Sequence, residues 1–167
     1  MDDRHTRSAH VLDPEYVAGL DTRTVDDLRA MHAECLELET EVSYVRRLTQ
    51  ARLDILEAEL SRRASGGTLE DLINALPQIL ADPGPRADPA SSRFPQKMAP
   101  DQESEWAGDL EESDNLLANL PALSDDDLRE AMERLRTLER EVSAERRALF
   151  GVIDRIDLDL AGRLSSQ

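Results

Sequence analysis

A pattern of five residues with polar or binding chemistry occurs twice in this chain at the same spacing, with four of the five residue types retained. The first copy reads glutamate, serine, arginine, glutamine and aspartate, and the second copy, 100 positions later, has phenylalanine in place of glutamine. The ten positions are Glu39, Ser43, Arg46, Gln50 and Asp54, followed by Glu139, Ser143, Arg146, Phe150 and Asp154. Steps of three and four residues place side chains on one face of a helix. Each copy is therefore predicted to form a polar stripe along a helix.

The residue types of the stripe suit a guanine nucleotide. A carboxylate can accept the adjacent N1–H and N2–H₂ groups of guanine, and an arginine can fork onto guanine O6 and N7 or onto a phosphate. A serine hydroxyl can donate to a phosphate oxygen. Two copies related by a local two-fold axis would suit a two-fold ligand or a pair of ligands, provided that the helices run antiparallel. The length of the chain between the copies does not decide that orientation.

A simpler interpretation treats the stripe as salt bridges that flank a helix contact. Two features argue against it. Serine is a mediocre residue inside a helix and has no part in a charge ladder, yet it recurs at Ser43 and Ser143. Residues 24–63 also align without a gap on 124–163, with 14 identities in 40 positions, and many of the retained residues are polar. A repeat that conserved only a fold would keep its apolar positions, so the retained polar residues point to function.

An apolar seam runs beside each stripe, one residue before it. The predicted seam positions are Leu28, Met31, Cys35, Leu38, Val42, Val45, Thr49, Leu53, Leu56 and Leu60, and then Leu128, Ala131, Leu135, Leu138, Val142, Glu145, Leu149, Ile153, Ile156 and Leu160. Both seams contain two successive steps of four, as from Val45 to Leu53, which predicts a stutter in a coiled coil. The two seams would bury each other. The predicted fold is all-α, with two long helices forming an antiparallel coiled-coil hairpin and a short helix and flexible linker between them.

Helix caps and helix-breaking residues divide the chain into segments. Thr24 and Ser124 each precede aspartates and are good helix caps. We predict five segments: a flexible arm over 1–22, the first motif helix over 24–64, a short helix over 68–80, a Pro-rich acidic linker over 81–113, and the second motif helix over 114–164.

The composition limits the possible functions. A net charge of −16 argues against direct DNA binding and favours a basic protein partner, although acidity could also serve only to keep the chain soluble. His5, His10 and His32 form no metal-ligand or catalytic pattern, so we expect no metal and no enzymatic activity. With Cys35 as the lone cysteine, and with no signal peptide or membrane span in the sequence, we expect a soluble protein in the cytoplasm.

The pattern Glu-x3-Ser-x2-Arg-x3-Gln-x3-Asp, occurring twice on a two-helix coiled coil, resembles the motif of the RsiG-type anti-sigma factors of actinobacteria. The first copy matches it at all five positions, and the second departs only at Phe150. The resemblance covers the two long helices, roughly half of the chain. It implies an antiparallel coiled coil that binds a dimer of cyclic di-GMP and, so loaded, holds the sporulation sigma factor WhiG inactive.

The resemblance also implies roles for the stripe. The four acidic residues would read guanine edges, Arg46 and Arg146 would contact bases or phosphates, and Ser43, Ser143 and Gln50 would be supporting donors. An aromatic side chain at Phe150 could pack on a guanine face. We expect a monomer that forms a one-to-one complex with its sigma factor and does not associate with membranes. The alternative is a coiled-coil adaptor that binds no ligand and whose repeat is a relic of duplication.

Overall fold

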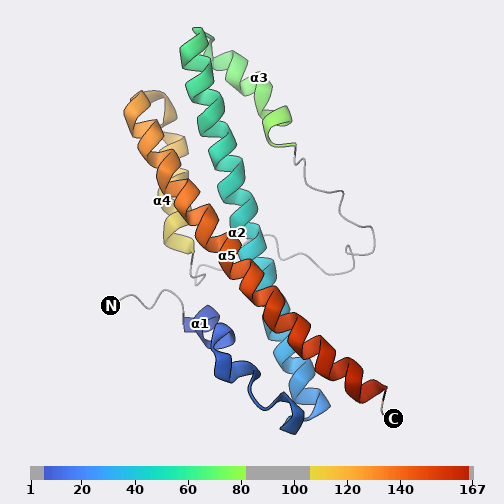
Figure 1. The fold of residues 1–167 in the computed structure, drawn as a ribbon. Coiled ribbons are helices and arrows are strands. Elements are labelled where there is room, and N and C mark those ends of the chain that lie inside the picture. Colours follow the sequence, from blue (N-terminus) through green and yellow to red (C-terminus); the bar gives the residue numbers. More distant parts are fainter. Residues whose placement is uncertain (1–5, 82–105, 166–167) are drawn as a thin grey trace.

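A computed structural model describes residues 6–81 and 106–165. Over these ranges the chain is helical and contains no strand. Helix α2 (Val25–Ser65) and helix α5 (Asp125–Leu164) are 41 and 40 residues long and pack against each other in opposite directions (Figure 1). The predicted all-α fold with an antiparallel hairpin of two long helices is confirmed.

The two long helices begin in the same way. The Thr24 hydroxyl accepts the backbone N–H of Asp27, and the Asp27 carboxylate accepts the backbone N–H of Thr24. Ser124 and Asp127 repeat this arrangement at the start of α5. Such reciprocal caps satisfy backbone donors that have no partner within the helix. Helix α2 ends at Gly66, whose φ of 70° suits a residue without a Cβ atom.

The seam of α2 differs from its prediction in its second half. The buried positions of α2 keep an unbroken alternation of three and four: Leu28, Met31, Cys35, Leu38, Val42, Val45, Thr49, Arg52, Leu56 and Glu59. Arg52 and Glu59 therefore occupy the places assigned to Leu53 and Leu60, and the stutter predicted for α2 is absent. A charged side chain can be buried when it is paired, and here Arg52 pairs with Asp114 while Glu59 pairs with two arginines. In α5 two steps of four do occur, from Glu145 through Leu149 to the buried Ile153.

The N-terminal segment is more ordered than the flexible arm predicted over 1–22. From residue 6 onward it forms helix α1 (Thr6–Leu12) and two 3-10 turns, η1 (Pro14–Val17) and η2 (Leu20–Thr22). Four apolar side chains in this segment, Val11, Tyr16, Val17 and Leu20, are buried. Their irregular spacing follows neither helical nor strand periodicity, which is why the sequence pattern did not indicate burial. Residues 1–5 lie outside the described ranges.

The segment before α5 also differs from its prediction. Helix α4 (Ala107–Ala118) and the 3-10 turn η4 (Leu120–Ala122) precede α5, whereas the prediction placed a linker over 81–113 and one helix from 114 onward. Burial of Trp106, Leu110 and Ser113 fixes α4 on the helix pair, and Pro121 and the Ser124 cap separate it from α5. Most of the predicted linker, 82–105, lies outside the described residues. Helix α3 (Leu69–Ile79) occupies the predicted short-helix segment.

Both ends of the hairpin are held by the same arginine contact. Arg63 Nε donates to Glu59 at 2.6 Å, while its Nη1 and Nη2 donate to the carbonyls of Leu123 and Leu120 in the turn before α5. One hundred positions later, Arg163 Nε donates to Asp159 at 2.6 Å, and its Nη atoms donate to the carbonyls of Arg23 and Leu20 before α2. The duplication therefore extends beyond the stripes to the turns that orient them.

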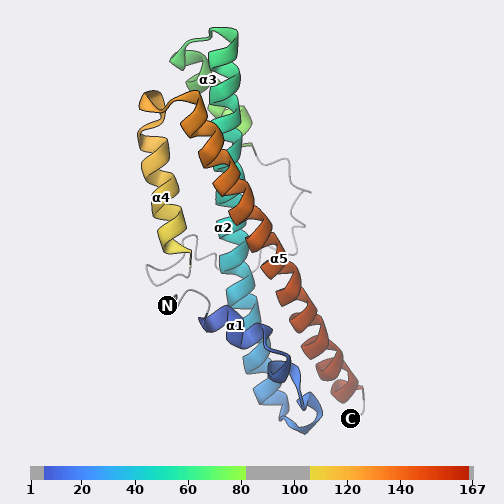
Figure 2. The same ribbon diagram turned by 60° about the vertical axis from the view of Figure 1, so that its left-hand side comes forward.

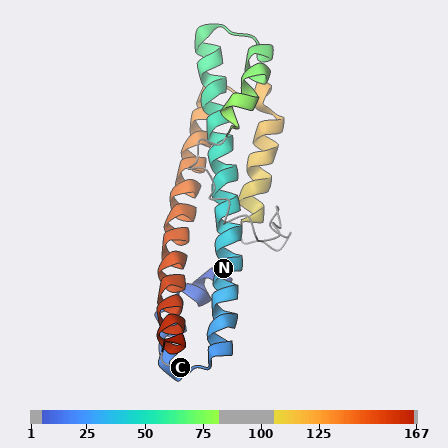
Figure 3. The ribbon, with the colours of Figure 1, turned by 90° about the vertical axis from the view of Figure 1, so that its right-hand side faces the viewer.

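The two shoulders of the helix pair are covered unequally. Figures 1 and 2 place α1 and α4 along the same side of the pair. Figure 3 looks at the other side, where α2 and α5 run side by side and α3 lies against the C-terminal part of α2. Among the described residues, no helix is long and apolar enough to span a membrane.

Candidate functional site

The repeated polar stripe lies on the shoulder of the pair that α1 and α4 leave uncovered. In a coiled coil, residues that directly follow a seam residue lie on one shoulder, and residues that directly precede one lie on the other. Glu39, Arg46 and their partners follow seam positions. Helix α1 and its turn instead contact residues that precede them, because Arg7 pairs with Glu37 and Tyr16 donates to Glu34. The α1 segment and the stripe thus occupy opposite shoulders.

One cluster joins the first copy of the stripe to the arginine of the second. Arg146 Nε lies 3.0 Å from Glu39 Oε1 and 2.7 Å from Ser43 Oγ. The Ser43 hydroxyl lies 2.5 Å from the same Glu39 oxygen and donates to it. The serine therefore connects the arginine of α5 to the glutamate of α2.

The second cluster repeats the first with the helices exchanged. Arg46 Nε donates to Ser143 Oγ at 3.0 Å and lies 3.4 Å from Glu139 Oε1. Ser143 donates to Glu139 at 2.8 Å. Each arginine thus completes the glutamate and serine pair of the other copy. The sequence placed these residues on one shoulder but did not show this exchange. The recurrence of serine four residues after glutamate was its only signal.

The clusters differ at the fourth stripe position. Gln50 crosses to α5, where its amide Nε2 donates to Glu139 Oε1 at 3.1 Å. Phe150 stays beside its own helix, and its ring centroid lies 4.7 Å from the Arg146 guanidinium carbon. The ring is 37% exposed. A polar bond between helices in one cluster is therefore replaced in the other by a cation–π contact.

The two aspartates of the stripe stand apart from the clusters. Asp54 and Asp154 are exposed, and neither forms a hydrogen bond or ion pair with another described residue. Because Arg52 rather than Leu53 takes the seam position, Asp54 lies a step further from the seam than predicted. Partial burial, with a smaller contribution from Glu57, raises the pKa of the Asp54 carboxyl. Both carboxylates are available to accept donors from a ligand.

The clusters are open to solvent on one side. The exposed fractions are 33% for the Arg46 side chain and 36% for Arg146, against 23% and 16% for the glutamates they face. Ion pairs this exposed contribute about 0–1 kcal/mol each, so a ligand could replace them at small cost. Arg47 and Arg147 lie nearby, and each donates Nε to the carbonyl of its own stripe serine, at 3.3 and 3.2 Å.

The stripe and its two clusters form an extended surface, which we call the rim. The hollows between α4 and α5 share no residue with the stripe. Within residues 6–81 and 106–165, no group of three His, Cys, Asp or Glu side chains is placed to hold a metal ion. The rim therefore offers carboxylates, hydroxyls and guanidinium groups on an extended surface, which suits a flat polar ligand.

The fold and the rim define a helical hairpin protein with a two-fold repeated polar site. Comparison with known proteins agrees with the resemblance inferred from the motif: residues 14–80 match the model of the RsiG-like family. The chain is thus similar to this family over the segment that contains η1, η2, α2 and α3, which is less than half of its length. A search of curated proteins finds no match. The matched segment holds the first copy of the stripe, Glu39 to Asp54, and ends before the second copy begins.

Proposed function

We propose that this protein is an anti-sigma factor that binds cyclic di-GMP, as a dimer of the nucleotide, on the rim formed by the two stripes. So loaded, it sequesters a WhiG-type sigma factor. The observation that carries the proposal is the pair of reciprocal clusters, in which each arginine reaches the glutamate and serine of the other copy. Two equivalent clusters related by the antiparallel arrangement match a ligand that is itself two-fold symmetric.

The chemistry of the rim supports a guanine ligand. Ser43 and Arg146 donate to the Glu39 carboxylate, and Ser143 and Gln50 donate to that of Glu139. Guanine N1–H and N2–H₂ would replace these donors with a pair of parallel hydrogen bonds. The released arginines would then turn to phosphates or stack on bases. Asp54 and Asp154, which have no ion partner among the described residues, would accept further guanine edges.

The two clusters would grip the ligand in different ways. Arg146 already rests on the Phe150 ring, and a guanine could extend that stack on the exposed part of the surface. Around Glu139 the same place is taken by the polar Gln50. The ligand would contact both helices in either cluster. Such contacts would hold the middle of the hairpin in one arrangement, and a partner that prefers this arrangement would bind more tightly when the ligand is present.

The test is a calorimetric titration of the whole chain with cyclic di-GMP, alone and in the presence of a WhiG-type sigma factor. We expect two nucleotides per chain and a tighter sigma factor complex when they are bound. Replacing both arginines (Arg46→Ala with Arg146→Ala) removes two charge-assisted contacts of about 1.5–3 kcal/mol each, so affinity should fall by at least 100-fold.

The duplication offers a matched control for the arginine variant. Arg29 and Arg129 are also 100 positions apart and are exposed. Among the described residues they pair only with Asp26 and Asp126, in the first turns of their own helices. Replacing both with alanine should leave nucleotide affinity within two- to three-fold of the starting value. Circular dichroism should show the same helicity for both double variants. Unchanged affinity for cyclic di-GMP in the Arg46 and Arg146 variant would show that these arginines do not bind the nucleotide.

A ligand-free adaptor is the second candidate. The observation in its favour is that the arginines and glutamates of the rim are already paired with each other. In that case the clusters act only to align α2 and α5. The adaptor predicts no heat on titration and no rise in melting temperature with cyclic di-GMP, whereas a bound ligand must raise it by mass action.

A further inference from the structure

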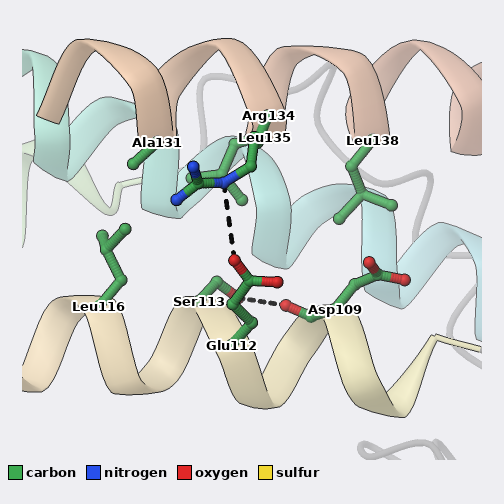
Figure 4. A pocket seen from close by; sticks show the side chains of 8 residues that line it. All are labelled: Asp109, Glu112, Ser113, Leu116, Ala131, Arg134, Leu135 and Leu138. Carbon is green, nitrogen blue, oxygen red and sulfur yellow. Dashed lines mark hydrogen bonds and ion pairs between the residues drawn. The ribbon is translucent and has the colours of Figure 1, made fainter. Parts of the chain in front are cut away.

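A groove lies between α4 and α5, on the shoulder opposite the polar stripe. Its floor is mainly apolar and its edge is acidic (Figure 4). The floor is formed by Leu116 of α4 and by Ala131, Leu135 and Leu138 of α5. The groove continues into a shallower hollow along α5 that is lined by Glu130, Glu133, Thr137 and Glu141. We call the two together the α4–α5 groove.

The charges of the groove are unbalanced. Its only lining cation is Arg134, which pairs with Glu112 of α4 at 3.6 Å and with Glu130 at 3.0 Å, so that it lies across the groove. Glu133 pairs with Arg136, outside the groove. Asp109 and Glu141 form no ion pair with any residue in the described part of the chain. Two carboxylates that have no ion partner among the described residues therefore face an apolar floor.

Helix α4 is held firmly enough to form a wall of a binding site. Leu110 and Ser113 are buried against the helix pair, and Asp114 pairs with Arg52, a seam residue of α2 that is 4% exposed. The groove is thus a fixed feature of the fold.

We propose that the α4–α5 groove docks a basic amphipathic helix of the sigma factor partner. The proposal rests on the anti-sigma function proposed above. A sigma factor binds promoter DNA and must present lysines and arginines to phosphates. Such side chains place their aliphatic stems on apolar surface and their charged heads in water. This arrangement matches a groove with an apolar floor and carboxylates at its edge. The net charge of −16 gives the same sign of complementarity over the whole chain.

The same features disfavour other occupants. Nucleic acid and small anions would be repelled by the carboxylates at the edge of the α4–α5 groove. None of the described acidic groups clusters in a way that could hold a metal ion. A second copy of this chain would bring a surface of like charge, which is unfavourable.

The sharpest variant neutralises only the two unpaired carboxylates, Asp109→Asn with Glu141→Gln. It breaks no ion pair among residues 6–81 and 106–165, and both substituted side chains keep the original size. Its matched control is Glu70→Gln with Glu111→Gln, which changes the net charge by the same amount at two exposed carboxylates outside the groove. Affinity of each full-length variant for a WhiG-type sigma factor is measured by calorimetry, at low and high salt, with and without cyclic di-GMP.

We expect the groove variant to bind the sigma factor about ten-fold more weakly at low salt, because two charge pairs between the edge of the groove and the sigma factor are lost. The difference should shrink at high salt. Affinity for cyclic di-GMP should not change, and the control variant should bind both ligands as the unaltered chain does. Equal weakening in the control would overturn the proposal, because it would show only a general charge effect.

Two further outcomes separate the possible failures. If the groove variant retains full sigma factor affinity while the unaltered chain binds the factor, the groove is not the docking site and the proposed function stands. If the unaltered chain does not bind the sigma factor even when loaded with cyclic di-GMP, both proposals fail. If the groove variant changes the oligomeric state in sedimentation analysis, the groove is an interface between copies, and the docking proposal is again overturned.

Discussion

The two halves of the helix pair share one plan but use different residues at its charged positions. In α2 the seam includes the buried Arg52 and Glu59, whereas the corresponding positions in α5 are Val152 and Asp159, which are only half-buried. On the rim the first half again has the more polar residue, because it has Gln50 where the second half has Phe150. What both halves keep is the glutamate, serine and arginine of each cluster and the arginine at each end.

This comparison indicates which interactions the fold and the rim require. The clamp formed by Arg63 or Arg163 joins each long helix to the turn before the other, and the clusters join the helices at their middle. The positions that differ between the halves lie beside these contacts. They can vary because a different neighbour, such as Asp114 or the Phe150 ring, takes over the local interaction.

The largest expected difference between the halves is in the two clamps. Arg63→Ala leaves the Glu59 carboxylate, which is 1% exposed, with Arg62 as its remaining cation. It should lower the free energy of unfolding by about 2–3 kcal/mol. Arg163→Ala frees a more exposed carboxylate, Asp159, and should cost about 1 kcal/mol. Urea unfolding followed by circular dichroism measures both, and equal losses would show that burial of the acid does not distinguish the clamps.

The pH dependence of stability should include a contribution from Glu59, in the first half. Hydrogen bonds from Arg62, together with those from Arg63, lower the pKa of the Glu59 carboxyl to about 2. A carboxyl whose pKa is lowered in the folded state contributes stability above its unfolded value of about 4.5. That contribution is lost as the pH falls from there toward 2.

Glu59→Gln tests this origin of the acid sensitivity. The variant should be less stable than the unaltered chain by about 1–2 kcal/mol at neutral pH. The difference should shrink between pH 4.5 and 2, where the unaltered chain loses its charged pair. Melting temperatures measured across this range decide the matter. A constant difference down to pH 2 would show that Glu59 is not the group that titrates.

The sequence alone could predict what depends on local pattern. The caps at Thr24 and Ser124, the two long helices and the shared shoulder of the stripes all follow from spacing and residue type. It could not predict that Arg52 and Glu59 are buried, because a charge enters a seam only when a partner from elsewhere in the fold meets it. Helix α4 was missed for a related reason, since its many acidic residues conceal the few side chains, such as Leu110, that bury it.

The exchange of arginines between the clusters belongs to the same class of feature. Arg46 and Arg146 could be assigned to one face from their spacing. Which glutamate each of them meets depends on the offset between two antiparallel helices, and that offset is set by contacts at the helix ends, such as those of Arg63 and Arg163. Sequence reasoning therefore found the members of the site more readily than their partners.

The smallest expected effect concerns Phe150, the one stripe position at which the halves differ in chemistry. If the ring supports Arg146 and extends a stack with guanine, Phe150→Ala should weaken cyclic di-GMP binding about three- to five-fold, the equivalent of roughly 0.5–1 kcal/mol for a cation–π contact.

Phe150→Gln would restore the residue found in the first copy. A glutamine there can reach Glu39 as Gln50 reaches Glu139, so this variant should recover most of the affinity while making the clusters alike. The reciprocal change, Gln50→Phe, removes a bond between the helices and should weaken binding without the same recovery. Calorimetry measures the affinity of the three variants for cyclic di-GMP and so shows whether glutamine or phenylalanine binds better at each position. An affinity in Phe150→Gln as low as in Phe150→Ala would show that the aromatic ring is needed at that place, and that the two halves of the rim have become specialised rather than merely different.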